Sequence, residues 1–187
     1  MSKDLNTKVV TGKVRLSYLH AFEPQKAPGS DVAKYSVSII IPKSDKATMA
    51  KITQAYNNAV EIGIAEKWGG KKPANLKKPV RDGDKERPDD AAYANSWFIN
   101  ANSKDAPGLV DRQLNRIIDQ SELYSGCYGR VSINFFPYNN VSVGVAAGLN
   151  HIQKLEDGEP LGGRASVESD FGDDFGDDEY DEDEPDW

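Results

Sequence analysis

The chain has 187 residues, of which 30 are acidic, 23 are basic and one is cysteine. A single cysteine excludes an internal disulfide framework, and no stretch approaches the roughly 18 apolar residues of a membrane span. Residues 1–10 also lack the apolar segment of a signal peptide, so a soluble intracellular protein without membrane contact is expected.

Charge is distributed unevenly along the chain. Residues 168–187 carry twelve Asp or Glu and no basic residue, which leaves 18 acidic against 23 basic residues in 1–167. A basic body beside an acidic tail indicates a body with an anionic partner and a tail that competes with that partner. We therefore predict one folded domain, residues 1–164, followed by a disordered acidic tail, residues 165–187.

Two strands are predicted near the N-terminus. Residues 8–20 and 33–42 alternate apolar and polar side chains, which is typical of half-buried strands. The alternation assigns Tyr18 and Tyr35 to the core and turns basic residues toward the solvent-exposed side of the strands.

A helix and a loop are predicted next. Pro42 ends the second strand, and Ser44 or Asp45 can cap a helix that continues to about residue 67. Helical spacing predicts its buried stripe, namely Met49, Ile52, Tyr56, Ala59, Val60 and Gly63. Residues 68–92 are rich in Gly, Pro and charge, and are predicted to form an exposed, mobile loop with a basic first part.

The second half of the chain predicts three further strands. They cover residues 96–102, 126–138 and 141–149, with Val131, Ile133 and Phe135 facing inward and Val141 inward on the antiparallel partner. Residues 106–122 are predicted to be irregular.

These elements favour a mainly β fold. Five short, one-sidedly polar strands and one helix are economically buried in a small antiparallel barrel of the oligonucleotide-binding (OB) type. The OB helix usually follows the third strand, whereas this one follows the second. Either a strand is missed, or the helix and the basic loop are an insertion.

Catalytic and metal-binding patterns are weak. The two histidines, His20 and His151, have no paired carboxylate at helical or strand spacing, and one cysteine with two distant histidines does not give the usual ligand spacings. We expect no enzyme, no cofactor and no metal site.

Binding of single-stranded nucleic acid fits better, because it needs a cationic groove and aromatic rings that stack on bases. The basic candidates are Lys13, Arg15, Lys34, Lys71, Lys72, Lys77, Lys78, Arg81 and Arg130. The aromatic candidates are Trp68, Trp97, Phe98, Tyr128, Phe136 and Tyr138. Trp97 and Phe98 are consecutive, so one of them must leave the core face of a one-sided strand.

Each feature alone also has an ordinary explanation. Lysine-rich loops are usually solvated, aromatic residues in strands are usually core, and acidic tails are often only solubilising. The occurrence of all three together, with opposite charges in separate segments, favours the nucleic-acid interpretation.

Four segments resemble a known family. Residues 12–24 (GKVRLSYLHAFEP), 34–43 (KYSVSIIIPK), 123–140 (LYSGCYGRVSINFFPYNN) and 144–163 (GVAAGLNHIQKLEDGEPLGG) are similar to the phage single-stranded DNA-binding proteins long catalogued as a domain of unknown function. The resemblance implies an OB-like fold. It also implies sequence-independent binding of single-stranded DNA during phage replication or recombination, in the cytoplasm of the infected cell.

The tail carries a second resemblance. Bacterial single-stranded DNA-binding proteins end in an acidic run, a Pro and an aromatic residue, and this chain ends similarly with Asp183, Glu184, Pro185, Asp186 and Trp187. This chain departs from the bacterial pattern because its last residue is Trp and because Asp186 lies between Pro185 and the aromatic ring. The resemblance implies a tail that regulates DNA access and docks replication or recombination proteins. A strand-annealing protein and a protein-interaction adapter remain the alternatives, and self-association into a homo-oligomer is left open.

Overall fold

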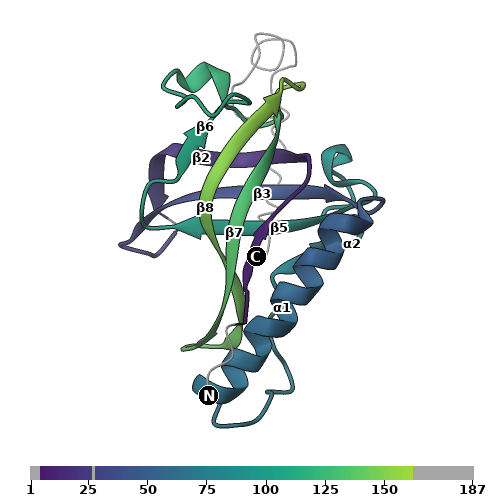
Figure 1. Cartoon of the computed structure of the whole chain (residues 1–187), viewed down its shortest axis with the longest axis vertical. Helices are drawn as coiled ribbons and strands as arrows, with labels where there is room; N and C mark the ends of the chain where they lie inside the picture. Colours follow the sequence, from purple (N-terminus) through teal and green to yellow (C-terminus); the bar gives the residue numbers. More distant parts are fainter. Residues whose placement is uncertain (1–4, 27, 162–187) are drawn as a thin grey trace, which may run out of the picture.

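The computed structural model describes residues 5–26 and 28–161, so the predicted acidic tail and its docking residues 183–187 lie outside the described part (Figure 1). The strands are β1 (Lys8–Val10), β2 (Val14–Lys26), β3 (Ala33–Pro42), β4 (Val80–Asp82), β5 (Ser96–Ser103), β6 (Gly108–Val110), β7 (Tyr128–Asn139) and β8 (Val143–Glu156). The helices are α1 (Lys46–Glu66), the short α2 (Gly83–Glu86), and the 3-10 turns η1 (Ala91–Tyr93) and η2 (Gln120–Glu122).

Five strands close into a barrel. β2, β3, β5, β8 and β7 pair in that order, and β7 returns to β2. The pairs are antiparallel except β5 with β8, which is parallel. This is the five-stranded Greek-key arrangement of the OB fold, so the predicted mainly β, OB-like class is confirmed. The helix follows the second barrel strand, as the sequence indicated, and β1 and β6 add to β7 and β8 outside the barrel.

β7 and β8 form a long hairpin that crosses β2, β3 and β5 in Figure 1. Val131, Ile133 and Phe135 of β7 are buried as predicted, because their shared parity turns them into the barrel. The expectation that Val141 faces the core is wrong. β8 begins only at Val143, so Val141 lies in the turn and is fully exposed.

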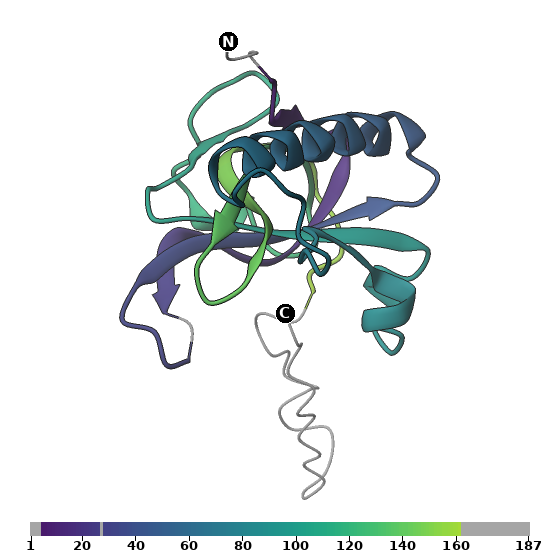
Figure 2. The same ribbon diagram turned by 90° about the horizontal axis from the view of Figure 1, so that it is seen from below.

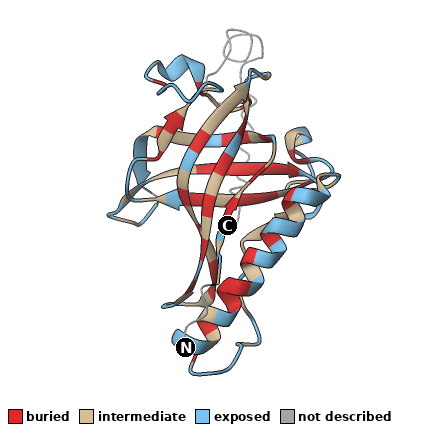
Figure 3. Cartoon of the chain, in the orientation of Figure 1, coloured by how far each residue is buried: buried red, intermediate tan, exposed pale blue. Residues whose placement is uncertain are grey.

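Helix α1 lies along one side of the barrel, against β1 and β7 (Figures 1 and 2). Asp45 caps it as predicted, since its carboxylate accepts the backbone N–H of Thr48 at 3.1 Å. Figure 3 shows the buried stripe along the helix. Its buried residues are Thr48, Ile52, Ala55, Asn58, Ala59, Val60 and Gly63, while the predicted Met49 and Tyr56 are half-buried.

Residues 68–92 are less irregular than expected, because β4, α2 and η1 lie in or extend just beyond this segment. β4 pairs with β5 at the end of β5 that β8 does not reach. Tyr93 of η1 is fully buried against Ile40 and Phe98, and its hydroxyl bonds the Ser38 side chain at 2.9 Å. The outer face of the sheet is therefore covered at this end by a second small core.

The alternation of β2 is interrupted by a bulge. Ser17 pairs with Ser38 and His20 pairs with Ser36, so β2 has one residue more than β3 between the two pairs. Tyr18 lies in the bulge with a positive φ of 46° and is 47% exposed. The assignment of Tyr18 to the core is therefore wrong, since the extra residue shifts the parity that the assignment used.

Candidate nucleic-acid interface

The outer face of the barrel carries a row of small polar residues. Strand register aligns Ser36 of β3 with Asn102 of β5, Asn102 with Gly148 of β8, and Gly148 with Asn134 of β7. Their neighbours Val37, Ala101, Ala147, Ile133 and Phe135 are buried inside the barrel. The row is thus an open, uncharged surface without large side chains, which we call the open face.

The hairpin presents two aromatic rings beside this row. Phe136 and Tyr138 share the outward parity of β7, and Phe136 is 44% exposed. The Phe136 ring lies 3.7 Å from the Cβ position of Gly148, so it borders the open face. Both rings were predicted as base-stacking candidates, and the structure brings them together at one place.

The basic loop reaches the same hairpin. The backbone of Lys77 pairs with β8, donating to Val143 O and accepting from Val145 N, each at 3.0 Å. A Cβ on Gly144 would meet Lys77 O at 2.6 Å and the Tyr138 hydroxyl at 2.8 Å. The absence of a side chain at Gly144 lets the exposed lysine and the ring approach one another.

Trp68 supports this hairpin from behind. Its ring is 9% exposed and its Nε1 donates to Tyr138 O at 3.1 Å. A Cβ on Gly63 of α1 would lie only 2.5 Å from the ring, so the indole fills the space that the glycine leaves. The prediction that Trp68 stacks on bases is wrong, because the ring belongs to the core.

Trp97 and Phe98, the consecutive aromatic residues of β5, point to opposite faces of the strand, and neither is fully exposed. Phe98 faces outward but is 1% exposed, because Tyr93 packs edge-on against it at 5.0 Å between ring centroids. Phe98 is therefore removed from the stacking candidates. Trp97 is half-buried at the other face, with the Lys43 ammonium 4.7 Å from its ring centroid.

Lys43 lies between two carboxylates at this edge, 2.8 Å from Asp82 and 2.9 Å from Asp84. The hydrogen bond from Lys43 lowers the pKa of both aspartates, and the bond to Asp82 raises the pKa of Lys43. These three charged groups form a partly buried ion-pair cluster that ties β4 to the end of β3.

Tyr128 lies far from the hairpin rings. It is eight residues before Phe136 on an extended strand, which separates them by roughly 26 Å. Lys13 and Arg15 lie over its ring, with 5.0 and 5.5 Å to the centroid. Lys13 also pairs with Glu156 at 2.6 Å, and Arg15 donates to two backbone carbonyls, so this group is largely occupied by contacts within the protein.

The other predicted basic residues are dispersed. Lys34, Lys71, Lys72 and Lys78 are exposed. Arg81 pairs with Glu86 at 2.9 Å, and Arg130 donates from Nε to Thr11 O at 3.1 Å. The structure thus places Lys77 and its neighbour Lys78 beside the hairpin that carries Phe136 and Tyr138. Lys13, Arg15 and Tyr128 form a second group at a distance from it.

Alternation assigned Tyr18 to the core, and no motif pointed to Arg87 as a binding residue. The Arg87 guanidinium lies 5.0 Å from the Tyr18 ring centroid and 4.9 Å from that of Tyr93. No local pattern predicts their contact, since they meet only through the bulge in β2 and the turn before η1.

Across residues 5–26 and 28–161, no group of three or more His, Cys, Asp or Glu side chains could hold a metal ion. No helix within the same ranges is long and apolar enough to span a membrane.

A closed OB barrel with an open face, bordered by aromatic rings and a lysine, defines the class of OB-fold proteins suited to single-stranded nucleic acid. The chain belongs to the family of the single-stranded DNA-binding protein of Enterobacter phage Enc34, which matches residues 7–184. This confirms the family that the sequence segments indicated.

One relative is similar to this chain in sequence, and two solved structures are similar to it in fold. The chain is 32% identical over 173 residues to putative protein p50 of Acyrthosiphon pisum secondary endosymbiont phage 1, covering 86% of this chain and 91% of that protein. Its fold is similar to the single-stranded DNA-binding protein from bacteriophage Enc34 in complex with ssDNA, with TM-score 0.75, 24% identity, and 87% and 97% of the two chains covered. It is also similar to gp2.5, a single-stranded DNA-binding protein of bacteriophage T7, with TM-score 0.60, 16% identity, and 92% and 97% covered.

Proposed function

We propose that this protein binds single-stranded DNA without sequence preference, during phage DNA replication or recombination in the cytoplasm of the infected cell. One observation carries the proposal. Phe136 and Tyr138 project from the outer side of the hairpin, and the loop that contains Lys77 pairs directly with that hairpin. Membership of the Enc34 family supports the choice of single-stranded DNA as the ligand.

The chemistry needed is binding alone. Lysines of the loop neutralise phosphates and release counterions, while exposed rings stack on bases of any sequence. The small residues of the open face let the strand approach the sheet backbone. We assign no catalytic role to any residue.

Fluorescence anisotropy of labelled oligonucleotides tests the proposal directly. Oligo(dT) and a mixed-sequence single strand should bind with similar affinity, a blunt duplex should bind more weakly, and log affinity should fall roughly linearly with log salt. Equal binding of duplex and single strands would refute the proposal. No binding of any nucleic acid would favour the protein adapter, and rapid pairing of complementary strands in the same samples would favour the annealing protein.

We also propose that the acidic tail regulates access to DNA. Its twelve carboxylates are tethered to a basic body, so their effective concentration at the DNA surface is high. Deleting residues 168–187 should raise DNA affinity, most at low salt, where charges are least screened. A tail with its Asp and Glu changed to Asn and Gln is the matched control and should behave like the deletion. Lower DNA affinity after deletion would contradict this model.

The tip of the tail has a separate proposed role. Trp187, following Asp183, Glu184, Pro185 and Asp186, is an aromatic anchor beside carboxylates and suits an apolar pocket with a basic rim on a replication or recombination protein. Removing Trp187 alone should leave DNA affinity almost unchanged and abolish partner binding in pull-downs of purified replication proteins. Unchanged partner binding would refute a docking role.

A further inference from the structure

We propose that Tyr18 stacks on a base of the bound strand, in a hollow at the β2 end of the open face. This inference rests on the proposed binding of single-stranded DNA and adds a second contact point, at the opposite end of the open face from the hairpin rings.

The backbone turns Tyr18 outward at an energetic cost. A φ of 46° is uncommon for a residue with a Cβ, because the left-handed region brings the Cβ close to the backbone. A bulge can re-aim a side chain, and this one places the ring of Tyr18 outside the core that Leu16 and Ala21 enter on either side. Such local strain beside an open surface is typical of ligand-binding positions.

Arg87 fixes the ring in this outward position. Its NH1 donates to the Tyr18 hydroxyl at 3.2 Å, and its guanidinium also lies 4.9 Å from the centroid of the buried Tyr93 ring. The cation is thus held by the second small core and in turn holds Tyr18. A ring that is already ordered loses less conformational entropy on binding, and the adjacent positive charge favours an anionic strand.

A hollow of about 600 Å³ opens beside the ring, lined by Ser17, Tyr18, Leu19, His20, Asp90, Ser125 and Leu161. Burial lowers the pKa of His20, which favours the neutral imidazole. The Asp90 carboxylate would repel a phosphate. The hollow is therefore better suited to an uncharged base than to the DNA backbone.

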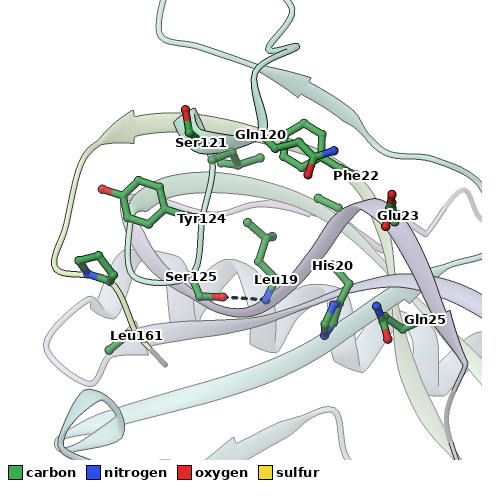
Figure 4. Close-up of a pocket in the computed structure, with 13 residues that line it drawn as sticks. Leu19, His20, Phe22, Glu23, Gln25, Gln120, Ser121, Tyr124, Ser125 and Leu161 are labelled. Carbon is green, nitrogen blue, oxygen red and sulfur yellow. Dashed lines mark hydrogen bonds between the residues drawn. The ribbon is translucent and has the colours of Figure 1, made fainter. Parts of the chain in front are cut away.

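The hollow continues into a second one of about 650 Å³ (Figure 4). The two share Leu19, His20, Ser125 and Leu161, and Figure 4 shows the hydrogen bond from Leu19 N to the Ser125 hydroxyl, with Phe22 and Tyr124 among the other residues that line the second hollow. Together they form an indentation lined by apolar side chains such as Leu19 and Phe22 and by polar ones such as His20 and Ser125, which can contact the faces and the edges of a base.

Strand register connects the hollow to the hairpin. His20 pairs with Ser36, which begins the row of the open face that ends at Asn134 beside Phe136. Around the barrel surface from β2 to β7, through β3, β5 and β8, there are four strand spacings, a path of roughly 19 Å. A strand of DNA that crosses the sheet along this row meets Phe136 at one end and Tyr18 at the other.

Photocrosslinking of the intact chain tests the contact without altering the protein. Oligo(dT) that carries 5-bromodeoxyuridine is bound and irradiated, and the modified peptides are mapped by mass spectrometry. We expect an adduct at Tyr18 besides one at the hairpin rings.

In anisotropy titrations, Tyr18→Leu should weaken binding about fivefold or more, since a stacking ring contributes about 1–3 kcal/mol, whereas Tyr18→Phe should retain most of the affinity.

Tyr56→Leu is the matched control, because this half-buried tyrosine lies on α1, away from the open face, and its loss should leave DNA affinity unchanged. If wild-type protein binds oligo(dT) but yields no adduct at Tyr18, and Tyr18→Leu binds equally well, this inference is overturned while the proposed function stands. If wild-type protein binds no single strand, the proposed function itself fails, and this inference fails with it.

Discussion

Replacing Phe136 by Ala should separate DNA binding from folding. The ring is 44% exposed on the outer side of β7, so its removal leaves the barrel interior intact. Loss of one stacking ring typically costs about 1–3 kcal/mol of binding free energy, which is a rise in Kd of about 5- to 150-fold. Because the ring is half out of the protein, we expect the free energy of unfolding to fall by about 1 kcal/mol or less.

The preceding residue is the matched control. Phe135 is 1% exposed and points into the barrel, so Phe135→Ala should cost about 3–5 kcal/mol of stability. Anisotropy with oligo(dT) gives Kd, and urea unfolding gives the free energy of unfolding for both variants. Equal loss of stability in the two variants, or an unchanged Kd for Phe136→Ala, would refute the assignment of Phe136 to the DNA surface.

Three further predictions follow from the loop, the helix and the ion pair. Replacing Lys77 and Lys78 by Ala should reduce the salt slope of DNA binding by about 1.4, since each phosphate contact on a single strand contributes about 0.7. Gly63→Ala should lower Tm, because a Cβ placed 2.5 Å from the Trp68 ring and 2.8 Å from Pro137 overpacks the core by about 1–3 kcal/mol. Lys43→Gln should weaken the dependence of the free energy of unfolding on pH in the acid range. The pKa of Asp82 and Asp84 is lowered in the fold, so their contribution is present above pH 3.8 and is lost as pH falls below it.

Each of these has a control elsewhere on the molecule. Lys46 and Lys51 are exposed on α1, so their replacement removes the same charge and should leave the salt slope almost unchanged. Asn57→Ala, at an exposed position of α1, should be neutral or slightly stabilising, and an equal effect of Gly63→Ala would contradict the packing argument. Urea unfolding between pH 2.5 and 6 measures the last prediction, with Lys46→Gln as control, and superimposable curves for Lys43→Gln and wild type would contradict it.

The sequence predicted the fold where local patterns and tertiary structure agree. β3 spans the residues expected, α1 begins after its predicted cap, and the parity of β7 gives both its core and its exposed Phe136. These elements follow directly from period-2 and helical spacing.

The remaining features depend on contacts between distant segments. Tyr93 covers Phe98 from a loop, and Trp68 enters the core through the gap at Gly63, so neither burial leaves a local signature. The bulge at Tyr18 reverses parity within one strand, and alternation then assigns the ring to the wrong face. The same limit applies to the site, because Lys77 meets Tyr138 only by pairing with β8.

The change of partner along β5 has a consequence for the dynamics of the DNA surface. Because β4 rather than β8 pairs with one end of β5, the distal half of the β7–β8 hairpin is held by other contacts. Helix α1 packs against β7, and further contacts come from Trp68, from the Lys77 backbone and from the bond that Asn139 Nδ2 donates to Lys67 O at 3.1 Å. The contacts of Lys67, Trp68 and Lys77 come from the segment that follows α1. The hairpin tip and the lysine loop therefore form one cooperative unit, whose amides should exchange with deuterium together and sooner than those of the closed barrel. The proposed DNA-binding surface can then open and close locally as one unit. DNA binding at Phe136 and Tyr138 should therefore slow amide exchange in the lysine loop as well.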